Sequence, residues 1–228
     1  RLAARDIDDG HVEITLPDGS TVRSNDDDLD ERVSAALGRR VQLERLRPAA
    51  DLDHYRRGAP DSDDVVNELR GIFGRDEHEP LPDFSIFPPI ITEFESPPGT
   101  YYDVFPLLMM TEAALRALAS ALPDSNVDIC RFRPSMVIDT GDDGTNASFP
   151  GHPEFEWRGR RATIGTATVE FGPPCPRCVM VTREIDDEIP TDRAVLRHIV
   201  RDLDQNLGVY ATIITPGVVR VGDRLSFG

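Results

Sequence analysis

Hydrophobic and polar residues alternate over residues 12–16, the pattern of a half-buried β-strand. A turn at residues 18–19 follows, so this stretch predicts a β-hairpin. Over residues 29–37 the apolar positions change to helical spacing, and Gly38 ends the run. Residues 39–46 favour a strand again. The chain is therefore predicted to open with a compact unit of β-hairpin, helix and strand.

The next part of the chain has weaker periodicity. Residues 48–64 are rich in Asp, Pro and Arg and predict a loop. Residues 62–74 predict a short helix that Asp61 or Ser62 would cap. Residues 75–100 carry six prolines and many acidic residues, and they predict an irregular connection. A connection of this length is typical of a functional segment or a domain boundary.

The last part of the chain combines helices and strands. Residues 110–123 predict an amphipathic helix capped by Thr111, and residues 190–208 predict another that begins at Pro190 or Thr191. Strands are expected over residues 132–139, 161–172 and 209–228, the last range holding two strands joined at Pro216 and Gly217. The fold class is α+β, with a strongly bent, barrel-like sheet and flanking helices.

Composition narrows the function classes. The 228 residues carry a net charge of −16, which disfavours nucleic-acid binding, and 39% are hydrophobic, which supports a buried core. No run of about 18 apolar residues predicts a membrane span. The three cysteines are an odd number and fit a reducing cytoplasm. The chain begins at Arg1 with no signal-peptide pattern, so we expect upstream residues to be missing.

The stretch "PPCPRCVMVT" holds Cys175 and Cys178 among three prolines that restrict the backbone. Four interpretations are open: half of a zinc site, a redox pair, two small buried thiols at a turn, or one thiolate bound to a soft metal. In the last case a cofactor would supply the other sulfur ligands. The residues after Cys178 read as a strand, which disfavours the redox pair.

Two other stretches carry candidate chemistry. Arg131 and Arg133 alternate along a predicted strand, so both would face one side and bind an anionic group, or form ordinary salt bridges. Asp103 lies between two tyrosines and an apolar run, and it would be a partly desolvated carboxylate or a simple turn residue. No GxGxxG, phosphate loop or Gly-x-Ser-x-Gly motif is present, which disfavours dehydrogenases, P-loop enzymes and serine hydrolases.

Four stretches together resemble one family: "YYDVFPLLMMTEAAL", "RFRPSMVID", "CPRCVMVTRE" and "NLGVYATIITPGVVRVGD". They occur in the order and spacing of the MOSC family, whose members carry the molybdenum-cofactor sulfurase C-terminal domain. Within it, the chain is similar to bacterial relatives of the mitochondrial amidoxime-reducing component. The resemblance implies a MOSC domain over residues 99–228. Residues 1–98 resemble the end of a truncated, β-rich N-terminal barrel domain and its linker.

The resemblance also implies a cofactor site. The second cysteine of the pair, Cys178, would ligate molybdenum in a molybdopterin cofactor, with Cys175 as an accessory. Asp103 would lie near the metal. Arg131, Arg133 and Ser135 would hold the pterin and its phosphate, although the family usually has Asn at the position of Ser135. The family's "YPVKS"-like front segment does not occur in this sequence.

The implied function is reduction of N- or S-oxygenated small molecules, such as amidoximes and N-hydroxylated bases. A separate redox protein would supply the electrons. One alternative is a sulfur carrier that uses a persulfide on Cys178. Another is a non-catalytic module that binds the cofactor.

Overall fold

The computed structural model describes residues 2–60, 63–141 and 148–228. Contacts divide the chain into two compact units, Arg1–Pro48 and Ala49–Gly228. Residues 49–98 thus belong to the larger unit. The domain boundary after residue 98, which the family resemblance implies, stays a prediction. Within the described ranges, no helix combines the length and apolarity that crossing a bilayer requires.

The first unit is a small antiparallel sheet with one helix. Strands β1 (Ala3–Asp6), β2 (Val12–Thr15) and β3 (Thr21–Arg23) pair in sequence order, after which α1 spans Leu29–Leu37. The predicted hairpin and helix are confirmed. The predicted strand over residues 39–46 is wrong.

The backbone of residues 39–46 bonds to side chains of α1 rather than to a neighbouring strand. Val41 exchanges two hydrogen bonds with the Ser34 hydroxyl, at 2.9 and 3.1 Å, and the Leu43 amide donates to Asp30 at 2.9 Å. Because these side chains satisfy the backbone, the apolar residues of the segment gain no partner strand, and Leu43 remains 45% exposed.

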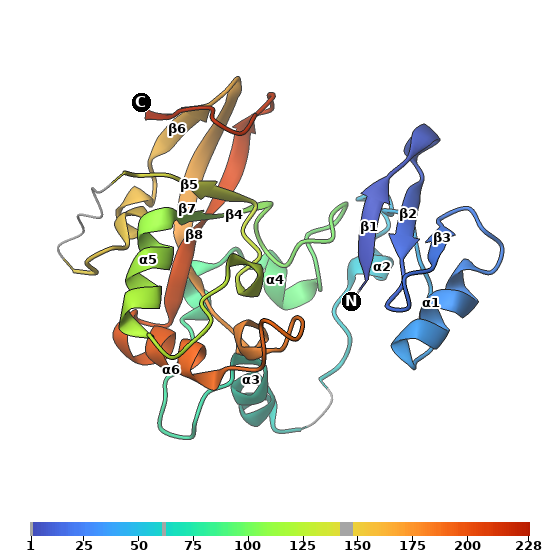
Figure 1. Cartoon of the computed structure of the whole chain (residues 1–228), viewed down its shortest axis with the longest axis horizontal. Helices are drawn as coiled ribbons and strands as arrows, with labels where there is room; N and C mark the ends of the chain where they lie inside the picture. Colours follow the sequence, from blue (N-terminus) through green and yellow to red (C-terminus); the bar gives the residue numbers. More distant parts are fainter. Residues whose placement is uncertain (1, 61–62, 142–147) are drawn as a thin grey trace. The chain divides into compact units, whose positions relative to one another are not determined.

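The second unit is built on a strongly curled six-stranded sheet in the order β5-β4-β8-β7-β6-β9 (Figure 1). The strands are β4 (Leu107–Thr111), β5 (Met136–Ile138), β6 (Arg161–Ile164), β7 (Ala167–Pro176), β8 (Asn206–Thr215) and β9 (Leu225–Phe227). All neighbours are antiparallel except β4 and β5. The predicted α+β class with a barrel-like sheet is confirmed.

Core side chains cover both faces of this sheet. Adjacent residues of β4 alternate in direction, so Met110 enters the cluster that holds helices α5 (Glu112–Ala121) and α6 (Arg193–Asp202). Met109 enters a second cluster around Trp157. Both methionines are 0% exposed, and the second half of β4, an inner strand of the sheet, is buried.

Caps define the ends of the two long helices. Thr111 caps α5 as predicted, since its hydroxyl accepts a hydrogen bond from the Ala114 amide at 3.0 Å. Helix α6 begins at Arg193, later than the predicted start at Pro190 or Thr191. The cap is Asp192, whose carboxylate accepts from the Ala194 amide at 2.8 Å.

The segment between the two units' sheets is mostly irregular, as predicted for residues 75–100. Its short helical pieces are α2 (Leu52–Tyr55), α3 (Val65–Phe73), η2 (Phe84–Ile86) and α4 (Ile90–Glu93). The predicted caps Asp61 and Ser62 lie outside the described residues. Asp64 caps α3 by accepting from the Asn67 amide at 3.0 Å.

Two predicted strand regions differ from the structure. The strand expected over residues 132–139 begins only at Met136, because Ile129–Arg131 forms a 3-10 turn, η3, and Arg133 has a left-handed φ of 52°. At the C-terminus two strands form as expected, but the second, β9, begins only at Leu225, and it pairs with β6. A further 3-10 helix, η4, spans Pro153–Trp157.

Candidate functional site

The cysteine pair lies where strand β7 ends. Cys175 is the last buried residue of β7 and is 3% exposed, whereas Cys178 is half-buried and precedes a 3-10 helix, η5, over Val179–Thr182. The strand predicted after Cys178 is therefore wrong. The Thr182 hydroxyl donates to the Val179 carbonyl at 2.8 Å and tightens this turn. The redox interpretation was disfavoured because a strand was predicted after Cys178. Since a helical turn follows instead, that argument against a redox pair no longer applies.

Prolines surround the pair because pairing between β7 and β8 is irregular there. The register shifts between Phe171 and Pro174 and again between Pro174 and Pro176. Proline has no amide hydrogen to donate, so it is tolerated where the ladder is interrupted. The prolines therefore belong to a bulged strand end rather than to the turn that the sequence suggested.

Arg177, between the two cysteines, anchors the turn in the core. It is 6% exposed, and its guanidinium donates to the Leu207 carbonyl at 2.8 Å, the Phe132 carbonyl at 3.2 Å and Met110 Sδ at 3.6 Å. Its own amide donates to the Gln205 carbonyl at 2.9 Å. Backbone and side chain together set the direction in which the next residue, Cys178, leaves the core.

Cys175 is sequestered by its surroundings. Burial raises the pKa of the Cys175 thiol, against the opposing effects of Arg177 and of Tyr210 on β8, and the thiol donates to the Pro176 carbonyl at 3.7 Å. The pKa of Tyr210 is also raised, mainly by burial and to a smaller extent by the nearby Cys175. The Phe105 ring stacks on the Tyr210 ring at a centroid distance of 4.8 Å. A buried, protonated thiol is a poor nucleophile and a poor metal ligand, so Cys178 is the more available sulfur.

Asp103 lies near the pair but is exposed. Its charge acts on both Cys175 and Tyr210, so the structure brings these sequence-distant groups together. The expected desolvation of Asp103 is wrong, because the flanking Tyr101 and Tyr102 are themselves 53% and 36% exposed. The Asp103 carboxylate is therefore accessible to solvent beside the cysteine turn.

Arg131 and Arg133 do not share a strand face, which corrects the prediction. Arg131 is 3% exposed, and its guanidinium donates to four backbone carbonyls, of Asn126, Val181, Arg183 and Pro190, at 2.7 to 3.4 Å. Arg133 is exposed on the left-handed turn before β5. The first arginine is thus committed to holding loops together, and the second is accessible to an anion.

Ser135 joins the edge strand to its neighbour. Its amide donates to the Leu108 carbonyl at 2.7 Å, and its hydroxyl accepts from the Leu108 amide at 3.2 Å. The hydroxyl hydrogen remains available to donate outward, since Ser135 is exposed.

Arg75 is a site residue that sequence reasoning missed. It is 6% exposed, and it donates to the Arg177 carbonyl at 3.0 Å and to Gln205 Oε1 at 3.1 Å. Burial and the like charge of Arg197 lower the pKa of Arg75 to about 10, while Glu79 and Cys178 act in the opposite direction. Arg75 therefore stays charged at neutral pH, close enough to Cys178 to interact with it electrostatically. No local motif marks it, because two of its partners, Arg177 and Gln205, lie more than a hundred positions away in the sequence.

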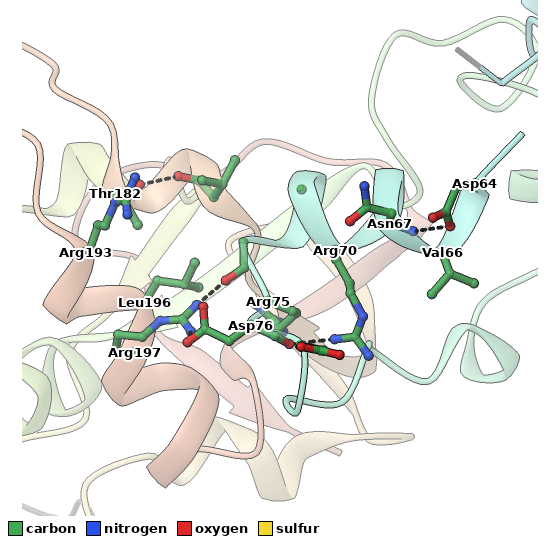
Figure 2. A pocket seen from close by; sticks show the side chains of 14 residues that line it. Asp64, Val66, Asn67, Arg70, Arg75, Asp76, Thr182, Arg193, Leu196 and Arg197 are labelled. Carbon is green, nitrogen blue, oxygen red and sulfur yellow. Dashed lines mark hydrogen bonds and ion pairs between the residues drawn. The ribbon is translucent and has the colours of Figure 1, made fainter. Parts of the chain in front are cut away.

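A pocket of about 920 Å³ opens beside the turn, between α3 and α6 (Figure 2). Figure 2 shows Arg70 of α3 on one side and Arg193 and Arg197 of α6 on the other. Val179, the residue after Cys178, also lines it. The predicted site residues Cys178, Asp103, Arg131, Arg133 and Ser135 are not among its lining residues.

Over residues 2–60, 63–141 and 148–228, no three His, Cys, Asp or Glu side chains converge so that they could hold a metal ion. Cys175 and Cys178 are free thiols and form no disulfide with each other. Among the described residues, a metal at Cys178 would thus find no set of three such ligands.

The comparison with protein families decides the identity. The MOSC domain profile matches residues 98–226. The chain belongs to the MOSC domain family. MOSC domains are associated with molybdenum-cofactor-dependent enzymes.

No curated protein matches this MOSC chain. One solved structure, described as "Crystal structure of an hypothetical protein", is similar at 16% identity and a TM-score of 0.40. The match covers 58% of this chain and 57% of that one, so the chain spans little over half of its length. The finer resemblance to relatives of the mitochondrial amidoxime-reducing component stays a prediction.

Proposed function

We propose that this MOSC chain binds a molybdenum cofactor through Cys178 and reduces N- or S-oxygenated small molecules, such as amidoximes and N-hydroxylated bases. A separate redox protein would deliver the electrons, in the cytoplasm, where free thiols persist. The observation that carries the proposal is the contrast within the pair: Cys175 is buried and hydrogen-bonded, whereas Cys178 is half-buried at the end of an anchored turn.

The residues around Cys178 fit such a cofactor. A metal bound to sulfur ligands carries negative charge, and two buried guanidiniums, of Arg75 and Arg177, lie around the cysteine turn. When bound, the cofactor supplies a molybdenum centre that can exchange an oxygen atom and two electrons with a substrate.

The other site residues have distinct proposed roles. Asp103, exposed beside the pair, would take up or release the proton that accompanies oxygen removal. Arg133 and Ser135, both exposed near β5, would donate to the cofactor's phosphate. Arg131 acts at a distance: its four carbonyl bonds connect the loop after Val181 to η3 and so hold the cofactor-side loops in place.

The test is elemental analysis of the protein purified from a host that makes the cofactor. We expect close to stoichiometric molybdenum in the wild type, almost none in Cys178→Ser and most of it in Cys175→Ser. Asp103→Ala should keep its molybdenum and lose reduction of an amidoxime by a reduced dye. Equal metal loss in both cysteine variants would indicate a paired-thiol site instead. Cyanide-labile sulfur without molybdenum would indicate a sulfur carrier.

A further inference from the structure

The turn that carries Cys178 is held by a segment outside the matched domain. We call residues 70–79 the strap. Arg75 of the strap donates to the Arg177 carbonyl at 3.0 Å and to Gln205 Oε1 at 3.1 Å, across sequence separations of 102 and 130 residues. The matched MOSC domain covers residues 98–226, so the strap precedes it.

The strap is itself fixed on helix α6. Arg197 pairs with Asp76 at 3.0 Å and also contacts Glu79 and the Gly74 carbonyl. Arg201 adds a contact to Glu79 at 3.4 Å. The strap therefore cannot move away from α6 without breaking several charge-assisted hydrogen bonds.

The backbone of the strap also fits closely against the turn. Gly74 has a left-handed φ of 59°, and a Cβ there would lie 2.8 Å from Leu196 Cδ2 and 3.4 Å from Val179 Cβ. A glycine thus ends α3 and lets the strap approach the residue that follows Cys178.

These contacts fix the peptide units on both sides of Arg177. Its amide donates to the Gln205 carbonyl, and its carbonyl accepts from Arg75, which holds the Gln205 side chain as well. Arg75 is 6% exposed, so no bulk water could replace it. The planar guanidinium suits this task, because one fork reaches two acceptors.

We infer that Arg75 is a positioning residue: it fixes the Arg177 peptide and thereby the direction of the Cys178 sulfur. The consequence of this positioning for a bound molybdenum rests on the proposed function. The strap makes the geometry of the cysteine turn depend on residues that the MOSC domain alone does not contain.

Hydrogen–deuterium exchange tests this without any metal. In Arg75→Gln and Arg75→Lys, we expect amides of residues 177–182 to exchange roughly five- to fifty-fold faster, since one buried acceptor loses its donor. The core strand β4 serves as internal reference and should keep its rate. The matched control is Arg70→Gln, whose contacts, the carbonyls of Asp76 and Glu79, stay within the strap.

Unchanged exchange at residues 177–182 in Arg75→Gln would overturn the inference. Equal acceleration in Arg70→Gln would overturn the assignment to Arg75 and indicate that the strap acts as a whole. In protein that retains molybdenum, Arg75→Gln should also change the g-values of the molybdenum electron paramagnetic resonance signal, which loss of stability alone would not do. If the wild type holds no molybdenum, the proposed function fails, while the exchange experiment still decides the positioning role.

Discussion

Thr111 serves two partners at once, and removing its hydroxyl should be costly. The hydroxyl accepts from the Ala114 amide at 3.0 Å as the cap of α5, and it donates to Glu154 Oε2 at 2.8 Å. Thr111 and Glu154 are both 0% exposed. The other Glu154 oxygen has no hydrogen-bond partner within the described residues. In Thr111→Val the buried carboxyl group would therefore lose the hydrogen bond that the structure gives it.

The expected loss has two parts. Loss of an N-cap costs about 1 kcal/mol. Leaving a buried polar group without its partner costs about 1–3 kcal/mol. The free energy of unfolding should therefore fall by about 2–4 kcal/mol in Thr111→Val. With a urea dependence of about 2 kcal/mol/M, the unfolding midpoint should fall by about 1–2 M.

The chain contains its own probe for this measurement. Its single tryptophan, Trp157, is 6% exposed and lies in η4, the same short helix as Glu154. Urea unfolding followed by Trp157 fluorescence thus reports on the unit in which Thr111 lies. Thr111→Ser keeps the hydroxyl and should lose less than about 1 kcal/mol.

Asp192 offers a matched comparison, because it caps α6 by accepting from the Ala194 amide and bonds to no buried carboxyl group among the residues that the structure describes. Asp192→Ala should cost only the cap, about 1 kcal/mol. If Thr111→Val costs no more than Asp192→Ala, the contribution assigned to buried Glu154 is wrong.

Two further predictions concern the candidate site. Arg131→Met should lower the free energy of unfolding by about 2–4 kcal/mol, because four backbone carbonyls lose their donor. The control variant Arg133→Gln should change it by less than about 0.5 kcal/mol. Similar losses for both variants in urea unfolding would contradict the structural role of Arg131. Burial raises the pKa of Cys175 above its ordinary 9.0, so above that pH the unfolded chain loses this proton and the folded chain keeps it. Stability should therefore fall as pH rises from about 9, by up to about 1.4 kcal/mol per pH unit. In Cys175→Ala the free energy of unfolding should fall less steeply between pH 8.5 and 10, a range below the ordinary pKa of 10.0 of Tyr210. Equal slopes in the wild type and the variant would refute the role assigned to Cys175.

The sequence by itself determined the features that depend on near neighbours. The hairpin, the helix over Leu29–Leu37 and the Thr111 cap were predictable, because side-chain periodicity and capping involve residues at most a few positions apart. The MOSC family was also recognisable from four short motifs, and Cys178 and Asp103 lie within two of them.

Local patterns misled wherever a distant partner competed with them. Residues 39–46 alternate like a strand, yet Ser34 and Asp30 bond their backbone. Arg131 looked like a partner for an anion, yet loops from Asn126 to Pro190 use its donors. In the first case two side chains satisfy the backbone, and in the second four backbone carbonyls accept from the side chain.

Only the tertiary structure decided which thiol is sequestered and what holds the other. Cys175 and Cys178 are equivalent in the motif, but burial raises the pKa of Cys175 beside Tyr210 of β8, whereas Cys178 is only half-buried. Arg75 meets Arg177 across 102 residues, and no local periodicity encodes such a pair. Hydrogen bonds of this kind form only after sheet, helix and strap have packed together, because burial is what removes water as a competing partner.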